Sequence, residues 1–256
     1  MSLVIQPIKA IPLIQPGDNL CQILFEALAR EKIDLQDNDI LVITQKIISK
    51  AEGRLVDITK VEPSDKAREI AAECQKDPRL VEVILSESKE VVRVAKGTLV
   101  VEHNLGFVCA NAGVDHSNID NTQSDEEIWY LKLPLNPDES ARKIRSYFKE
   151  RAGVNIGVIV IDSHGRAWRE GIVGIMIGTA GVPALVDMRG QLDLFGEPLL
   201  ITQIGAADEL AAASSLVMGQ ANEHIPVVHV RGFPYPLSDE TSLGDVLREK
   251  GKDLFR

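Results

Sequence analysis

Short runs of β-branched residues, separated by segments with helical spacing, constrain the fold of this chain more than any other feature. Each run is bounded by turn or charged residues and predicts a buried strand: residues 40–43, 154–161, 199–204 and 227–230. Residues 91–101 predict a hairpin that turns near Lys96 and Gly97.

Helix signals lie between these runs. Residues 63–65 (Pro-Ser-Asp) form one start signal, and apolar residues follow them at helical spacing. Pro137 opens a second helix that Gly153 ends, and Asp208 begins an alanine-rich helix that runs to about Gly219. Because strands and helices are mixed without a regular strand–helix–strand alternation, we predict an α+β fold.

Composition limits the classes of function. The chain carries 28 Lys and Arg against 38 Asp and Glu, a formal charge of −10, which disfavours nucleic-acid binding. No apolar run reaches the length of a membrane span, and the proline-broken N-terminus lacks the apolar core of a signal peptide. Three widely spaced cysteines suit a reduced cytoplasm. Since no composition break marks a linker, we treat residues 1–256 as one unit, with an arrangement in two lobes as the alternative.

The common phosphate-binding motifs do not occur. The chain contains neither G-x-x-x-x-G-K-[S/T] nor G-x-G-x-x-G. Its five histidines form no H-E-x-x-H motif, and such residues are more typical of surface or core positions than of zinc ligands. A bound nucleotide would therefore need a binding site built without either of these phosphate-binding motifs.

Residues 111–118 (NAGVDHSN) are a first candidate site. Asp115 and Asn118 follow an apolar run, and Gly113, which lies between that run and Asp115, permits the chain to bend. Magnesium prefers oxygen ligands, typically one or two carboxylates with phosphate and water. An Asx-turn, in which such side chains bond their own backbone, is the more common interpretation of this segment taken alone.

Residues 161–166 (IDSHGR) are a second candidate. An apolar strand delivers Asp162 and Ser163 at its end, where a carboxylate beside a hydroxyl can hold Mg²⁺ near phosphates. A plain boundary between strand and loop explains the pattern equally well. Arg166 and Arg169 could pair with phosphate or carboxylate, or lie on a solvated face.

Residues 44–54 (TQKIISKAEGR) are a third candidate. They follow a predicted strand and carry three cations, of which Lys50 could contact phosphate. By itself the segment indicates only a charged amphipathic turn of helix.

Read together, these segments resemble the coenzyme F420-0:γ-glutamyl ligase family. The matching stretches occur in the family's order and span nearly the whole chain: residues 11–14 with 17–18, then 44–54, 111–118, 162–171 (DSHGRAWREG), 206–213 (AADELAAA) and 216–232 (LVMGQANEHIPVVHVRG). SKAEGR, NAG-x-D-x-SN and D-[S/T]-x-GR form a specific set.

The resemblance implies a mixed-sheet fold specific to the family and distinct from P-loop and Rossmann folds. A division of this fold into two intertwined lobes is an alternative. It implies a homodimer that uses GTP and two divalent cations, Mg²⁺ or Mn²⁺, and leaves room for a monovalent cation. Some bacterial members carry a fused C-terminal reductase-like domain, which we do not expect in a chain that stops at Arg256.

The site residues implied by the resemblance are carried over by matched position. Lys50, Asp115 and Asp162 would be catalytic; Asp115 and Asp162 would bind one metal, and Ser163 and Gln220 the second. The nucleotide would contact Ile11, Pro12, Leu13, Ile14, Thr44, Gln45, Lys50, Asn118, Met218, Gly219, Gln220, Ala221, Asn222, Glu223, His224 and Ile225. Two positions depart from the family: His164 replaces Asn or an aromatic residue, and Gln220 replaces a Glu found in some members.

The implied reaction activates the carboxylate of the F420 precursor as an acyl phosphate, which the amine of L-glutamate attacks. Residues 118–127 are a candidate lid that would exclude water. Three alternatives stay open: a folate-type glutamate ligase of the same fold, a nucleotide- or metal-binding module without ligase activity, and a nucleoside triphosphate hydrolase.

Overall fold

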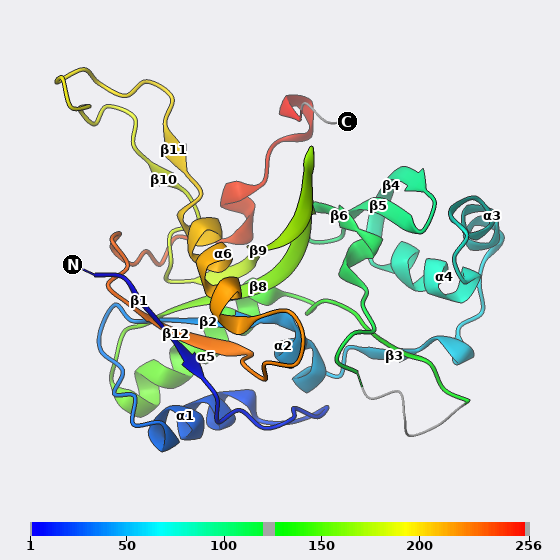
Figure 1. The fold of residues 1–256 in the computed structure, drawn as a ribbon, viewed down its shortest axis with the longest axis horizontal. Helices are drawn as coiled ribbons and strands as arrows, with labels where there is room; N and C mark the ends of the chain where they lie inside the picture. Colours follow the sequence, from blue (N-terminus) through cyan, green and yellow to red (C-terminus); the bar gives the residue numbers. More distant parts are fainter. Residues whose placement is uncertain (1, 120–125, 254–256) are drawn as a thin grey trace.

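The computed structural model describes residues 2–119 and 126–253 and confirms an α+β architecture with a mixed central sheet (Figure 1). The sheet has five strands in the order β1 (Val4–Ile8), β12 (Val227–Arg231), β2 (Ile40–Thr44), β8 (Gly157–Arg166) and β9 (Arg169–Ala180). β2 and β8 are parallel, whereas the other neighbouring strands are antiparallel.

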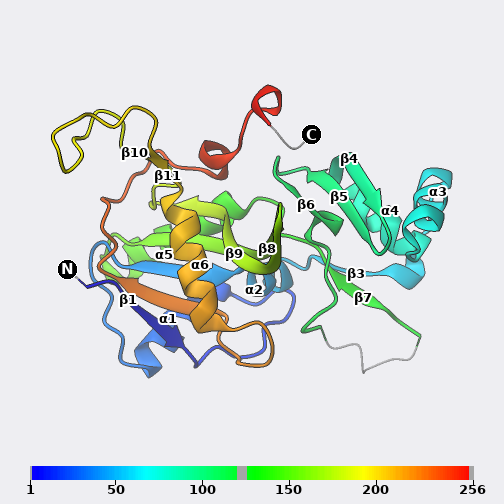
Figure 2. The same cartoon turned by 45° about the horizontal axis from the view of Figure 1, so that its top comes forward.

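Helices cover both faces of this sheet, with α6 (Ala206–Met218) in front and α5 (Pro137–Ala152) behind, next to α1 (Leu20–Arg30) (Figures 1 and 2). Two glycines of β9 allow this close packing. A Cβ on Gly174 would lie 2.7 Å from the Ala211 carbonyl oxygen of α6, and one on Gly178 would lie 2.4 Å from the Pro137 Cβ of α5. The β-branched residues of β2 and β8 are buried between the two layers.

A smaller lobe holds a second buried cluster of apolar residues (Figure 2). It contains the three-stranded sheet β4 (Ser88–Ala95), β5 (Thr98–His103) and β6 (Val108–Ala110). Helices α3 (Asp65–Cys74) and α4 (Pro78–Ser86) pack against it. The pair β3 (Leu55–Asp57) and β7 (Trp129–Leu131) runs between this lobe and the large sheet. Helix α2 (Gln45–Ala51) directly follows β2.

Most predicted elements are confirmed, with shifted ends. The Ser64 side chain caps α3, and Asn136 and Gly153 cap the two ends of α5. The predicted hairpin is formed by β4 and β5, and α6 begins two residues before Asp208. No helix among residues 2–119 and 126–253 is both long and apolar enough to span a membrane.

The strand predicted at residues 199–204 is wrong for its first four residues. The regular strand is limited to β11 (Gln203–Ile204), which pairs with β10 (Val186–Asp187), although Leu199 and Thr202 make isolated backbone hydrogen bonds across the same arm. Leu200 and Ile201 are 79% and 87% exposed. These residues belong to an arm, residues 185–204, that extends away from the large sheet (Figure 1). An apolar run is buried only where a second layer covers it, and within the described residues no layer packs on this part of the arm.

The strand predicted at residues 154–161 is also displaced. β8 begins at Gly157 and continues five residues beyond Ile161, as far as Arg166. It continues because β9 provides an antiparallel partner there. Residues 120–125 of the predicted lid lie outside the described residues, so the lid stays a prediction.

Candidate active site

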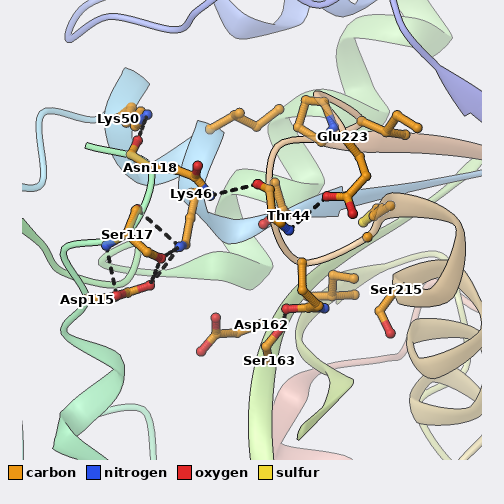
Figure 3. Close-up of a pocket in the computed structure, with 18 of the residues that line it drawn as sticks. Thr44, Lys46, Lys50, Asp115, Ser117, Asn118, Asp162, Ser163, Ser215 and Glu223 are labelled. Atoms are coloured by element: carbon orange, nitrogen blue, oxygen red, sulfur yellow. Dashed lines mark hydrogen bonds and ion pairs between the residues drawn. The ribbon is translucent and has the colours of Figure 1, made fainter. Parts of the chain in front are cut away.

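A cavity of about 730 Å³ lies at the point where β2 ends and α2 begins (Figure 3). Five parts of the chain line it: residues 11–14, the junction of β2 and α2, residues 110–119, β8 with Ile172 of β9, and residues 218–226 with Ser215. Three of these parts contain the segments that the sequence singled out as candidate sites.

β8 exposes Asp162 and Ser163 because its neighbour β2 ends first. Thr44, the last residue of β2, pairs with Ile161, and the chain then turns into α2. The expectation that Asp162 and Ser163 end their own strand is therefore wrong: they lie inside β8, beside the end of β2. Since consecutive strand residues face opposite sides, the two side chains reach the cavity from the two faces of the sheet.

A histidine holds Asp162 from one side. The Oδ2 atom of Asp162 lies 2.9 Å from Nε2 of His164, two residues along on the same face of β8. The His164 ring is buried and packs on Phe107, with ring centroids 5.3 Å apart. The carboxylate of Asp162 therefore has a restricted orientation at the cavity wall.

Ser163 faces the opposite way, towards the segment after α6. Its hydroxyl donates a hydrogen bond of 2.9 Å to the side-chain oxygen of Gln220. Gly219, with φ of 75°, ends α6 and turns the chain into this segment. The backbone N–H of Ala221 then donates to the Glu223 carboxylate at 2.8 Å.

Asp115 is fixed by its backbone and by three donors. Its N–H and C=O bond Leu131 at 3.1 and 2.8 Å. Its carboxylate accepts from the Ser117 N–H at 2.9 Å, from the Ser117 hydroxyl at 2.5 Å and from the Lys46 ammonium at 2.6 Å. The Asx-turn considered as an alternative is thus present, in a residue that also lines the cavity.

The pKa of Asp115 reflects these contacts. Burial raises the pKa, but the hydrogen bonds from Lys46 and Ser117 outweigh it and lower the pKa to about 2. Asp115 is therefore an anion at neutral pH, the form in which a carboxyl group binds a cation.

Two lysines on one side of α2 face the segment that carries Asp115. Lys46 bonds Asp115, and one turn later Lys50 donates to the carbonyl oxygen of Asn118 at 2.6 Å. Burial, and next the positive charge of Lys46, lower the pKa of Lys50. The third cation of the segment lies elsewhere: Arg54 pairs with Glu87 at 2.8 Å.

Nearly all residues carried over from the family resemblance line this cavity. They are Ile11, Pro12, Leu13, Ile14, Thr44, Lys50, Asp115, Asn118, Asp162, Ser163, Met218, Gly219, Gln220, Ala221, Asn222, Glu223, His224 and Ile225. The exception is Gln45, which is 1% exposed and accepts a hydrogen bond from the Ser49 hydroxyl. Arg166 and Arg169 do not line the cavity either.

Sequence reasoning missed Lys46, Ser117 and Ser215 as residues of the site. The spacing of Lys46 and Lys50, one helical turn apart, was the available signal for Lys46. Ser117 and Ser215 are common surface residue types, and only the fold brings them to the cavity.

The oxygen donors of the site suit a hard divalent cation. Among the described residues no group of three or more His, Cys, Asp or Glu side chains is arranged to hold a metal ion. Carboxylate, hydroxyl and amide oxygens nevertheless meet at this cavity, in Asp115, Asp162, Ser163 and Gln220. These are ligands that Mg²⁺ and Mn²⁺ prefer, so the residues present fit such ions.

Comparison with known proteins shows first that the chain is an enzyme of the ligase class. The sequence profile of the F420-0:gamma-glutamyl ligase family matches residues 8–232, and the chain belongs to this family. It is 42% identical to the coenzyme F420:L-glutamate ligase of Methanothermobacter thermautotrophicus over 100% of both chains. It is 45% identical to the protein of that name from Methanocaldococcus jannaschii, over 96% of this chain and 94% of the relative.

Proposed function

We propose that this protein joins L-glutamate to coenzyme F420-0 in a reaction driven by GTP. One observation carries the proposal: Asp115, Asp162, Ser163 and Gln220 line the same cavity as Lys46 and Lys50. The full-length similarity to proteins named coenzyme F420:L-glutamate ligase supports this choice of substrates.

The cavity supports nucleotide binding without a P-loop or a Rossmann motif. Residues 11–14 and Ile225 provide apolar side chains, and Thr44 and residues 218–224 provide backbone and polar groups, a combination that suits a base and a ribose. The Lys50 ammonium and the Asn118 side chain belong to the same wall as Asp115, where the phosphates would lie.

Asp115 and Asp162 would hold one divalent cation, and Ser163 and Gln220 a second. Bound cations would neutralise phosphate charge and make the γ-phosphorus easier to attack. His164 would keep Asp162 turned to the cavity, because it bonds one of its two carboxylate oxygens.

The reaction would proceed in two steps. An oxygen of the F420-0 carboxylate attacks the γ-phosphorus of GTP, and GDP leaves. The amine of L-glutamate then attacks the acyl carbon of the acyl phosphate, loses a proton, and phosphate leaves as the amide forms. Holding the amine beside the acyl phosphate is worth on the order of 7 kcal/mol or more. The Lys50 ammonium would stabilise charge on the phosphoryl oxygens.

The arm at residues 185–204 supports a homodimer. Its tip exposes large apolar side chains, with Leu192, Leu194 and Phe195 exposed by 67%, 99% and 90%. Such a surface is expected to be covered in solution, and a second copy of this chain is the partner that the family resemblance implies. Leu194→Ser with Phe195→Ser should shift the mass measured by light scattering from dimer to monomer. Leu135→Ser, at a 74% exposed residue outside the arm, should not.

Mass spectrometry of the products tests the proposed reaction. Purified protein is incubated with L-glutamate, Mg²⁺ or Mn²⁺, either GTP or ATP, and either F420-0 or a folate. A product heavier by one or more glutamyl residues, formed with GTP, is expected. A folate-type ligase would extend a folate instead, a hydrolase would release phosphate without glutamate, and a binding module would leave all substrates unchanged.

Asp162→Asn tests the role of the Asp162 charge in the same assay. It removes one charge with little change in volume, so product formation should fall by at least about a hundredfold while the melting temperature stays within a few degrees. Wild-type turnover in the variant would contradict the role of Asp162.

A further inference from the structure

The ammonium of Lys46 lies in a cage of oxygen atoms (Figure 3). Its Nζ atom is 2.6 Å from Asp115 Oδ2 and 3.2 Å from the Ser117 carbonyl oxygen, and it also bonds the Ser117 hydroxyl. A lysine ammonium carries three N–H donors, and these three acceptors use all of them. Lys46 is therefore a fully coordinated cation rather than a side chain that points into open solvent.

The cage offers the oxygen types that a hard divalent cation takes. A carboxylate, a hydroxyl and a backbone carbonyl are also common ligands of such ions. Both partners of the ion pair are shielded from water in part, with side-chain exposures of 22% for Lys46 and 39% for Asp115. A positive charge already occupies one of the two carboxylate oxygens to which a divalent cation at Asp115 could bind.

Lys50 provides a contrast on the same helix. It lies one turn further along α2, and its ammonium donates to the Asn118 backbone carbonyl at 2.6 Å. The two lysines tether the same segment, but Lys46 is the one that bonds a proposed cation ligand. Its long, flexible side chain can leave Asp115 without movement of the helix.

We propose that Lys46 is a resident counter-cation that competes with the divalent cation for Asp115 and turns to the phosphates once that cation binds. The inference rests on the proposed cation site at Asp115 and Asp162. Two cations at one carboxylate repel each other, so cation binding displaces the ammonium. The displaced ammonium then favours a phosphate group in the same cavity. Cation and nucleotide should therefore bind cooperatively, and the coupling should be reciprocal.

The test measures Mn²⁺ binding by calorimetry on the full chain, with and without GDP, which cannot donate a γ-phosphoryl group. Wild type is compared with Lys46→Met, with Lys46→Gln, and with Lys66→Met, which removes the same charge from an exposed position on α3. Lys46→Gln retains N–H donors and covers the case in which Lys46→Met does not fold. Melting temperature without metal checks the fold of each variant.

Without GDP, both Lys46 variants should bind Mn²⁺ at least about fivefold more tightly than wild type, the lower end of typical coupling between sites. GDP should tighten Mn²⁺ binding in wild type and in Lys66→Met, and less so in the Lys46 variants. A purely structural role of Lys46 predicts the opposite sign, namely weaker Mn²⁺ binding in the variants.

Each outcome decides between the two proposals. Mn²⁺ binding to wild type with equal or lower affinity in the Lys46 variants overturns the inference and leaves the cation site standing. Absence of Mn²⁺ binding in wild type and in every variant overturns the cation site and this inference with it.

Discussion

The hydroxyl of Ser163 donates a hydrogen bond of 2.9 Å to the side-chain oxygen of Gln220 and so joins β8 to the segment after α6. These are the two side chains that would hold the second cation. Their contact shows that two segments, 57 residues apart in the sequence, bring oxygen atoms within reach of one ion. The amide of Gln220 is neutral, so this pair provides no negative charge.

The charge of the side chain at position 220 should set the cation concentration that the enzyme needs for half-maximal activity. Because hard cations bind more tightly to ligands with more negative charge, Gln220→Glu should lower the Mg²⁺ concentration for half-maximal activity several-fold. Gln220→Ala should raise it. The measurement is a titration of glutamyl transfer against Mg²⁺ and Mn²⁺ for the three proteins. Three superimposable curves would show that Gln220 does not contact a cation.

The ion pair of Asp115 should make stability depend on pH. Burial opposes ionisation, but Lys46 and Ser117 hold the pKa at about 2, below its ordinary value of 3.8. A lowered pKa stabilises the folded state fully above the unfolded value, and this stabilisation is lost as the pH falls from about 4 towards 2. Asp115→Asn should therefore lower the free energy of unfolding at pH 7 and have a smaller effect at pH 3.

The expected loss at pH 7 is about 1 kcal/mol, because solvent screens a side chain that is 39% exposed. Urea unfolding in the presence of a metal chelator measures it. Glu69→Gln, at an exposed carboxylate of α3, is the control and should change the free energy of unfolding by less than about 0.5 kcal/mol. An equal loss at pH 7 and pH 3 would contradict the assignment to the Asp115 charge.

The sequence predicted elements with strong local signals and missed properties set by neighbours. Ser64 and Gly153 are chemical signals for helix ends, and both lie where predicted. The apolar run near Ile201 had the composition of a buried strand, but burial requires a second layer that only the fold can supply. Asp162 was predicted at the end of its own strand because composition cannot show that the neighbouring strand ends there.

For the candidate site, too, the sequence predicted the segments involved, whereas the contacts between them depend on the fold. The family resemblance selected the segments with Asp115 and Gln220, and the fold brings them to one cavity. The resemblance could not show that Lys46 bonds Asp115, because this contact joins residues 69 positions apart. Gln45 was assigned to the site by its position in a matched segment, yet its side chain is turned inward to Ser49.

Gly178 should be required for the packing of α5 on the sheet. A Cβ at this position would lie 2.4 Å from Pro137 Cβ, so Gly178→Ala must push α5 away. We expect a loss of roughly 1–3 kcal/mol in the free energy of unfolding, as for other overpacked cores. Gly165→Ala, where an added Cβ meets no atom within 4 Å, is the control. Equal stability of the two variants in urea unfolding would contradict the close packing.

Lys50 should contribute to nucleotide affinity through its charge. Its ammonium lines the cavity and donates to the Asn118 carbonyl, and the cavity wall around it is where the phosphates would lie. A charge-assisted hydrogen bond to phosphate is worth about 1.5–3 kcal/mol, so Lys50→Ala should weaken GDP binding roughly 10- to 150-fold. Calorimetry with GDP and Mg²⁺ measures this, with Lys66→Ala as a control for the loss of one exposed charge. If Lys50→Ala binds GDP as wild type does, Lys50 serves only to hold the backbone at Asn118.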